Sequence, residues 1–233
     1  MNPKTKITVI AVLVLLLLAT SAVYVQAFYR QKPVYGVETD KKIVALTFDI
    51  SWGYETAPAV LEILKANQVQ CTFFLSGPWA TQYPEVVKRI KADGHEIASH
   101  GHRHLNLTNF SKSEIKEEIM KAHQAIQAVT GEPPRLIRAP NGDYNDNVME
   151  AIHECHYQAI HWGTDSLDWM NPGVPIIIER INKRIHPGDI ILMHASDTCK
   201  QTVQALPAII NNIRSQGYEI VTVSELLQEA AAD

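Results

Sequence analysis

The feature that most constrains the fold is an alternation of short apolar runs with segments of helical period, which starts near Lys42 and continues to the C-terminus. The apolar runs are Ile43–Phe48, Cys71–Leu75, Glu96–Ser99, Leu136–Ala139, Tyr157–Trp162, Ile190–Met193 and Glu219–Val223. The helical patterns between them lie near residues 55–67, 79–92, 112–129, 145–154, 174–185, 201–216 and 224–231. Strand–helix repeats with apolar strands predict a parallel sheet, and this number of units favours a closed or nearly closed barrel. We therefore expect an α/β fold.

The first thirty residues differ from the remainder of the chain. Lys4 and Lys6 precede Ile7–Val25, which contains no charged side chain. As a helix this segment would span about 28 Å, close to the hydrocarbon thickness of a membrane. The leading lysines favour a cytoplasmic N-terminus and export of the rest of the chain. The sequence therefore predicts an N-terminal hydrophobic helix and an extracytoplasmic domain.

Two interpretations of this N-terminal helix stay open. Residues 1–27 are either a membrane anchor or a signal peptide cleaved near the small residues Val25-Gln26-Ala27. Residues 28–41, with Pro33 and Gly36, are expected to be a linker, and residues 42–233 to form one domain.

Composition excludes several classes of function. Lys and Arg total 21 and Asp and Glu total 25, so no basic excess is present to bind the phosphates of a nucleic acid. The 3 cysteines are too few and too scattered for a disulfide framework or a zinc cluster. We expect a monomeric globular domain that does not bind nucleic acid.

Ionisable residues follow five of the predicted strands. They are Asp49, the group His100, His102 and His104, then Arg138, the pair Asp165 and Asp168, and finally His194. In barrels of parallel strands the active site is built at the C-terminal ends of the strands. This mixture of carboxylate, imidazole and guanidinium groups at one end predicts an active site there.

The spacing of His100 and His104 favours a metal site. Residues four apart lie on one side of a helical turn, and two imidazoles so placed suit a divalent cation. A solvated polar loop, or histidines that cap nearby carbonyls, is the alternative. Asp49 is a metal ligand, a general base or the N-cap of the following helix.

The other strand-end residues also have two interpretations each. His194 is a general acid, since its ordinary pKa lies near neutrality, or a structural histidine. Arg138 holds a carboxylate in its ionised form or makes a surface ion pair. Asp168 orients a histidine or caps the turn before Trp169.

These residues lie in five motifs that resemble those of the polysaccharide deacetylases, the NodB homology domain of carbohydrate esterase family 4. The resemblance covers about residues 40–227, and the motifs come in the family's order. They are Thr47-Phe48-Asp49-Ile50 (T-F-D-D), His100-Gly101-His102-Arg103-His104 (H-[S/T]-x-x-H), Arg138-Ala139-Pro140-Asn141-Gly142 (R-x-P-Y-G), Asp165-Ser166-Leu167-Asp168-Trp169 (D-x-x-D-W) and Leu192-Met193-His194 (L-x-H). The resemblance implies a distorted (β/α)7-type barrel.

The resemblance also implies metal-dependent hydrolysis of the amide in an N-acetylated glycan, either peptidoglycan or a chitin-like polymer. His100 and His104 would hold a divalent metal, zinc or cobalt, that polarises the acetamide carbonyl and acidifies a water molecule. Asp49 would be the general base, and Arg138 would orient it.

The remaining motif residues would complete the site that the family pattern describes. His194 would protonate the leaving amine, tuned by Asp168. Trp169 and Leu192 would line the pocket for the acetyl methyl group, and the backbone N–H near Asn141 would help to stabilise the oxyanion.

The first motif departs from the family pattern at Ile50, where the family has its third metal ligand. Isoleucine has no donor atom, and two histidines alone bind a divalent ion weakly unless another oxygen completes the shell. Asp49 then becomes a ligand, or the metal is loosely held, or catalysis is impaired. A non-catalytic glycan-binding or scaffold protein with this fold is therefore the alternative function.

The residues Ile50-Ser51-Trp52-Gly53 are similar to the PdaB-like branch of the family, found in spore-forming bacteria. This resemblance implies that the protein acts in the envelope of the sporulating cell and that its polymer is peptidoglycan.

Overall fold

The computed structural model describes residues 32–231, in which strands and helices alternate as the sequence predicts. The strands are β1 (Ile43–Ile50), β2 (Thr72–Leu75), β3 (Glu96–Ser99), β4 (Leu136–Ile137), β5 (Gln158–Ala159), β6 (Thr164–Asp165), β7 (Ile190–His194) and β8 (Glu219–Val221). The helices are α2 (Thr56–Ala66), α3 (Gly77–Gln82), α4 (Pro84–Ala92), α5 (Lys112–Thr130), α6 (Asp146–Glu154), α7 (Val174–Arg184), α8 (Thr202–Ser215) and α9 (Val223–Ala231). Short 3₁₀ turns occupy Leu107–Asn109, Pro140–Gly142 and Asp168–Met170.

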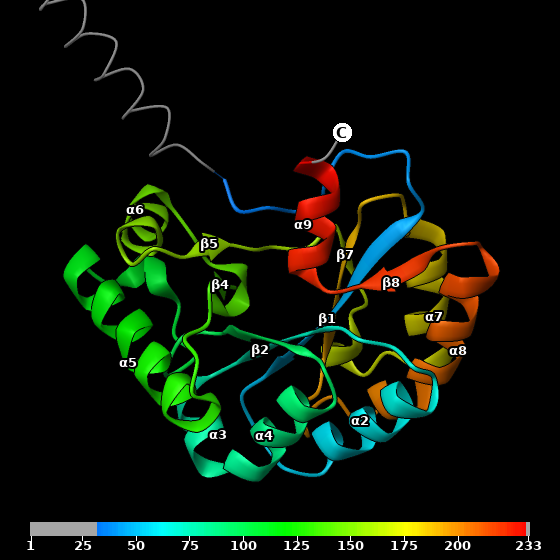
Figure 1. Cartoon of the computed structure of the whole chain (residues 1–233), viewed down its shortest axis with the longest axis horizontal. Helices are drawn as coiled ribbons and strands as arrows, with labels where there is room; N and C mark the ends of the chain where they lie inside the picture. The colour runs from blue at the N-terminus through cyan, green and yellow to red at the C-terminus, as the bar shows by residue number, and fades with distance from the viewer. Residues whose placement is uncertain (1–31, 232–233) are drawn as a thin grey trace, which may run out of the picture. The chain divides into compact units, whose positions relative to one another are not determined.

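All the pairings among these strands are parallel, and they form one curled sheet. The order is β5-β4-β3-β2-β1-β7-β6, and β8 pairs with the first residues of β1, Ile43–Ala45. Figure 1 shows the strands in the middle of the domain with α2 to α8 around them. Within residues 32–231, β5 and β6 end the order and do not pair with each other, so the barrel is open. The predicted distorted (β/α)7-type barrel is confirmed.

The central strand β1 divides its side chains between two environments. Leu46, Phe48 and Ile50 pack in the cluster that joins the sheet to α2 and α8. Thr47 and Asp49 point to the opposite side, where both accept hydrogen bonds from Arg138. Because successive side chains of a strand alternate in direction, β1 sends its polar residues inward at its C-terminal end.

Two predicted elements differ in detail from the structure. The helix expected near 79–92 is two helices, α3 and α4, because Pro84 starts the second one and cannot continue the hydrogen bonds of the first. The run Tyr157–Trp162 contributes β5 alone, and the two residues of β6 form a further strand after Gly163. Short strands of this kind carry too few residues for a recognisable alternation.

Part of the segment expected to be a linker lies against the open side of the barrel. Val34 donates to the carbonyl of Ala159 (2.9 Å) and accepts from the backbone N–H of His161 (2.7 Å). Val37 donates to the carbonyl of Gly188 (2.9 Å). Residues 34–37 therefore bridge the gap between the end of β5 and the start of β7.

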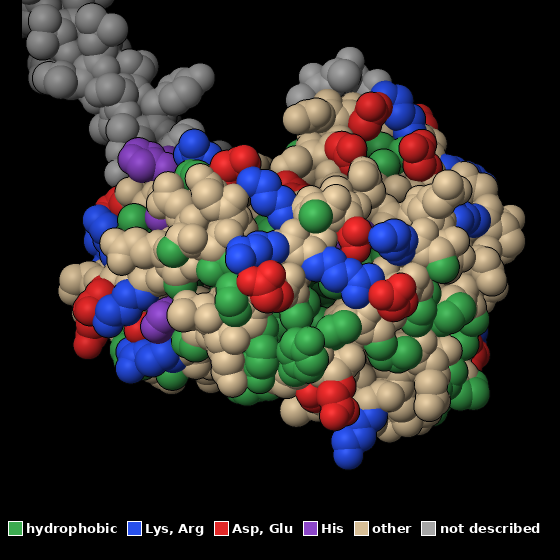
Figure 2. All heavy atoms as spheres, turned by 60° about the horizontal axis from the view of Figure 1, so that its bottom comes forward, with side chains coloured by type: hydrophobic (Ala, Val, Ile, Leu, Met, Phe, Trp, Pro, Cys, Tyr) green, Lys and Arg blue, Asp and Glu red, His purple; other side chains and the backbone are tan. Residues whose placement is uncertain are grey.

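The apolar stretch Ile7–Val25 lies outside the described residues, so the choice between anchor and signal peptide stays a prediction. Within residues 32–231, no helix combines the length and the apolarity that a membrane crossing requires. On the face shown in Figure 2, acidic and basic side chains are interspersed and hydrophobic side chains gather below the centre of the view.

The buried face of α5 provides a test of the packing. Ile119 is fully buried in a cluster with residues of β4 and α6, whereas the next residue, Met120, is 36% exposed. We expect Ile119→Ala to lower the free energy of unfolding by about 3 kcal/mol through lost burial and a residual cavity. Met120→Ala should change it by less than about 0.5 kcal/mol. Equilibrium unfolding in urea measures both, and equal effects would contradict this packing.

Candidate active site

The C-terminal ends of the strands surround a cavity of about 360 Å³. Seven of the nine predicted site residues line it: Asp49, His100, His104, Asn141, Trp169, Leu192 and His194. The other two, Arg138 and Asp168, are fully buried behind this lining. The structure therefore brings all the predicted site residues to one end of the barrel.

A buried ion pair between Arg138 and Asp49 forms the floor of the site. Arg138 Nη1 donates to Asp49 Oδ1 (2.7 Å) and to Thr47 Oγ1 (2.9 Å), and Nη2 donates to the carbonyl of His161 (2.8 Å). The guanidinium also lies 4.1 Å from the ring centre of Phe74. Burial alone would raise the pKa of the Asp49 carboxyl, but the charge and hydrogen bond of Arg138, together with the nearby histidines, outweigh burial, so this pKa is lowered. Asp49 is thus an ionised proton acceptor.

His100 faces Asp49 in its neutral form. Its Nδ1 lies 3.0 Å from the carbonyl of Arg138, which can only accept, so Nδ1 carries the proton. Nε2 is then unprotonated and lies 3.5 Å from Asp49 Oδ2. Burial lowers the pKa of His100 to about 4, against the opposing effect of the Asp49 charge. A neutral imidazole fixed through its other nitrogen is the usual state of a metal-binding histidine.

His104 lies beside His100, but the backbone between them is not the helical turn that the spacing predicts. Residues 100–104 form a bent loop rather than a helical turn, with positive φ at Gly101 (70°) and at His104 (55°). The expected helical turn is therefore wrong, because β3 ends in a loop. The ring centre of His104 nevertheless lies 5.0 Å from that of His100, and burial lowers its pKa. His102 turns away from the cavity and packs beside Gly77.

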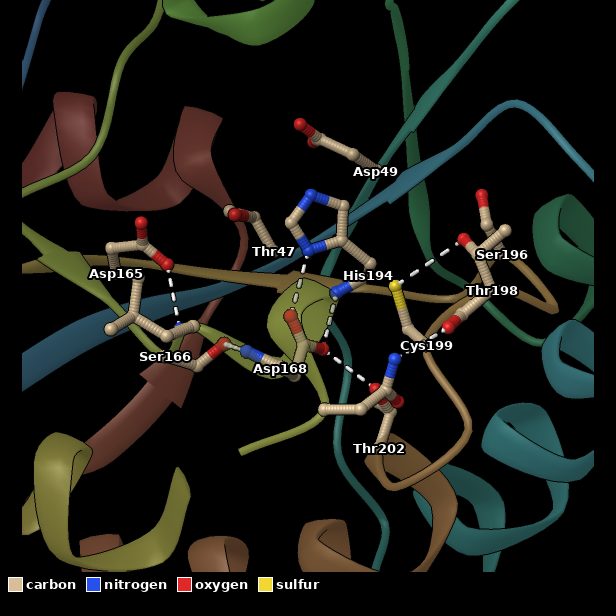
Figure 3. A network of polar contacts seen from close by, with 12 residues as sticks. Thr47, Asp49, Asp165, Ser166, Asp168, His194, Ser196, Thr198, Cys199 and Thr202 are labelled. Carbon is tan, nitrogen blue, oxygen red and sulfur yellow. Dashed lines mark hydrogen bonds and ion pairs between the residues drawn. The ribbon is translucent and has the colours of Figure 1, made fainter. Parts of the chain in front are cut away.

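On β7, His194 forms a second charged unit with Asp168. His194 Nδ1 lies 2.7 Å from Asp168 Oδ1, and Asp168 Oδ2 accepts from the backbone N–H of His194 (2.8 Å) and from Thr202 Oγ1 (2.6 Å). Figure 3 shows the other ring nitrogen of His194 turned toward Asp49. Burial alone would lower the pKa of His194, but the hydrogen bond to Asp168 and its charge outweigh burial and raise it. The buried Asp168 carboxylate therefore holds the His194 imidazole in place and favours its protonated form.

Cys199 lies beside this pair, and one donor atom each of Asp168, His194 and Cys199 lie within 4.8 Å of one another. The 2.7 Å between His194 Nδ1 and Asp168 Oδ1 is a hydrogen bond, shorter than the roughly 3.3 Å that separates two ligands of one tetrahedral zinc. Burial also raises the pKa of the Cys199 thiol to about 12, which keeps it protonated. This group is a hydrogen-bonded network rather than a metal site.

The donor set near Asp49 fits a divalent metal, with one donor fewer than the family pattern. His100 and His104 are neutral imidazoles, and a carboxylate lies next to them. Ile50, at the position of the family's third ligand, is fully buried in the apolar cluster on the helix side of β1. The hydroxyl of the next residue, Ser51, is buried without a hydrogen-bond partner among the described residues.

Sequence reasoning missed the contribution of two loops to the cavity wall. Trp52, after β1, and Ser196, Thr198 and Cys199, after β7, all line it. Trp52 lies two residues after the first motif and the others two to five residues after His194, and this closeness to the motifs is the signal that could have found them. The two loops also hold each other, since Ser196 Oγ accepts from the backbone N–H groups of Ser51 (3.0 Å) and Trp52 (3.3 Å).

Comparison with known proteins identifies the family. A family model described as polysaccharide deacetylase matches residues 36–160, more than half of the chain. A peptidoglycan-N-acetylglucosamine deacetylase of Bacillus cereus is 36% identical over 195 residues, which cover 82% of this chain and 91% of that protein. The uncharacterized protein YlxY of Bacillus subtilis is 33% identical over 86% of this chain, and the match spans 62% of YlxY, less than two thirds of its length.

One relative with a solved structure is described as a pseudoenzyme rather than as an active deacetylase. BA3943 of Bacillus anthracis, described as a CE4 family pseudoenzyme, matches with a TM-score of 0.79 and 34% identity over 84% of this chain and 69% of the other. A mutant of BA3943 is described as having restored enzymatic activity. The fold, the order of the motifs and these relatives together show that the chain belongs to the polysaccharide deacetylase family.

Proposed function

We propose that this protein removes N-acetyl groups from amino sugars of cell-wall glycan by metal-dependent hydrolysis. One observation carries the proposal. The cavity holds an ionised carboxylate next to two neutral imidazoles, and it also holds a histidine whose pKa is raised by a buried aspartate. A base, an acid and a metal-binding pair are what hydrolysis of an unactivated amide requires.

The base in this proposal is Asp49. His100 and His104 would hold the metal, which would acidify a water molecule and polarise the acetamide carbonyl when bound. Asp49 accepts a proton from the attacking water as oxygen bonds to the carbonyl carbon. Arg138 fixes the carboxylate through Oδ1, which leaves Oδ2 on the side of His100. The Arg138 guanidinium therefore orients the base and keeps it ionised.

The acid in this proposal is His194. When the carbon–nitrogen bond breaks, His194 donates a proton to the amine, so that acetate and a free amino sugar leave. Asp168 raises the pKa of this imidazole and so favours its charged form before that step. Trp169 and Leu192 line the same cavity and supply apolar surface for the acetyl methyl group.

The proposed substrate is peptidoglycan, because the B. cereus relative is described as acting on peptidoglycan N-acetylglucosamine. The apolar segment Ile7–Val25 supports export, so we propose an extracytoplasmic location with attachment to the membrane or secretion. The similarity of Ile50-Ser51-Trp52-Gly53 to the PdaB-like branch supports a role in the sporulating cell. The absence of a basic excess fits a protein without nucleic-acid ligands, and we propose a monomer.

A second candidate function rests on Ile50. A protein that lacks one metal donor and resembles a pseudoenzyme could bind glycan in the same cavity without hydrolysing it. The two candidates share the fold and the cavity. They differ in whether acetate is released.

Acetate release from N-acetylated peptidoglycan in the presence of zinc or cobalt tests the enzymatic proposal. We expect His104→Ala to lower the metal-dependent rate at least about 100-fold, because it removes one of two imidazole donors. His102→Ala, in the same motif but turned away from the cavity, should retain most of the activity. No acetate under either metal, with His104→Ala indistinguishable from the unmodified protein, would favour the non-catalytic candidate.

The pH profile tests the role of His194. As the acid, His194 must be protonated, so activity falls as the pH rises through its raised pKa. Asp168→Asn removes the charge that raises this pKa and should move the alkaline limb of kcat/KM down by about one pH unit or more. Thr202→Val, which removes only one hydrogen bond to Asp168, should move it less. An unmoved alkaline limb in Asp168→Asn would exclude His194 as the group responsible.

The environment of Ile50 predicts the outcome of restoring the family's aspartate. Because Ile50 faces the apolar cluster, Ile50→Asp buries an unpaired carboxylate and should lower the free energy of unfolding by at least about 3 kcal/mol in metal-free buffer. Ile50→Val should cost about 1 kcal/mol. Thermal and urea unfolding measure both variants. If Ile50→Asp is as stable as Ile50→Val, the side chain at this position faces the cavity instead.

A further inference from the structure

We propose that Trp52 binds a sugar ring next to the one whose acetamide enters the cavity, and so positions the glycan; this inference rests on the proposed function. The Trp52 side chain is 52% exposed and lines the cavity with Asp49, His100 and His104. Trp169, on the loop after β6, is 51% exposed and lines the same cavity. Large exposed aromatic side chains at the rim of a cavity mark a binding surface.

The loop that carries Trp52 is fixed in place before any ligand arrives. The Trp52 carbonyl accepts from the backbone N–H of Asp197 (3.0 Å), and the Gly53 carbonyl accepts from Trp79 Nε1 (2.7 Å). The Asp197 carboxylate accepts from the backbone N–H groups of Tyr54, Glu55 and Thr56. A loop held on both sides loses little freedom on binding, so its tryptophan is preorganised.

Gly53 shows how closely this loop is packed. Its φ is +82°, and a Cβ atom at this position would lie 2.1 Å from the Asp197 carboxylate. A side chain here would therefore displace the carboxylate that holds the loop. The tight approach fixes where the preceding residue, Trp52, presents its ring.

The contacts of the Trp52 ring leave room for a ligand. The indole packs against His104 with 4.6 Å between ring centres and a tilt of 55°. About half of the side chain stays exposed, and its indole N–H donates to no other residue of the described part. A hexosamine ring has a face of C–H groups that packs on an indole and hydroxyl groups that accept from its N–H.

The charge of the cavity indicates which ligand it takes. Among residues 32–231, no lysine or arginine lines it, whereas Asp49 and Asp165 do. A phosphorylated polymer would find no lysine or arginine there, while an N-acetylated glycan backbone offers apolar ring faces and hydroxyls. A cavity of about 360 Å³ is near the lower limit for small-ligand sites, so neighbouring sugar units must lie over its rim, where Trp52 is.

Binding of chito-oligosaccharides to metal-free protein tests this inference without turnover. We expect Trp52→Ala to raise the dissociation constant for the N-acetylglucosamine tetramer about tenfold and Trp52→Phe to restore most of the affinity. The constant for the monosaccharide should change less than twofold. Tyr54→Ala is the matched control, because Tyr54 is 55% exposed on the same loop but does not line the cavity. It should leave tetramer binding unchanged.

Steady-state kinetics with zinc-loaded protein give a second readout. Trp52→Ala should raise KM for the tetramer about tenfold and lower kcat by a clearly smaller factor. Unchanged tetramer binding in Trp52→Ala, equal losses in Trp52→Ala and Tyr54→Ala, or no tetramer binding by the unmodified protein would each overturn the inference. If the tetramer binds through Trp52 and no acetate is released with any metal, the inference stands and the proposed hydrolysis fails.

Discussion

The arrangement of the site depends on the ion pair between Arg138 and Asp49 inside the barrel. Both side chains are buried, and removal of one partner from such a pair costs about 3–5 kcal/mol because the other charge is left alone. The pair also connects separate strands. Asp49 and Thr47 belong to β1, Arg138 follows β4, and the backbone carbonyl of Arg138 orients His100 after β3. A change at Arg138 therefore affects the Asp49 carboxylate and the His100 imidazole together.

Three neighbouring groups are held in different protonation states by their surroundings. The charge of Arg138 favours the ionised form of Asp49, burial favours the neutral form of His100, and the buried Asp168 carboxylate favours the protonated form of His194. Titratable groups whose pKa values are moved apart in one cavity allow proton acceptance and donation at the same pH. Ile50 does not disturb the arrangement of these three groups, because its side chain packs in the core between β1 and the helices.

The strands and most of the residues that line the cavity could be predicted from the sequence, because the end of a strand is a local feature. The apolar runs predicted the positions of β1, β3 and β7, and the polar residue after each run lines the cavity. The bent loop at His104 could not be predicted, because spacing alone does not distinguish a helical turn from a loop with positive φ. The contacts of residues 34–37 and of Trp52 depend on chain segments more than a hundred residues away, which no local pattern encodes. The direction of Ile50 follows from strand alternation once the end of β1 is known.

The most direct test of the account is an anomalous difference map, recorded at the zinc absorption edge, from crystals of the protein grown with zinc. We expect a peak bound by the imidazoles of His100 and His104 on the side where Asp49 lies. A peak at Asp168, His194 and Cys199 instead, or no peak in the cavity at a zinc concentration that supports acetate release, would contradict it.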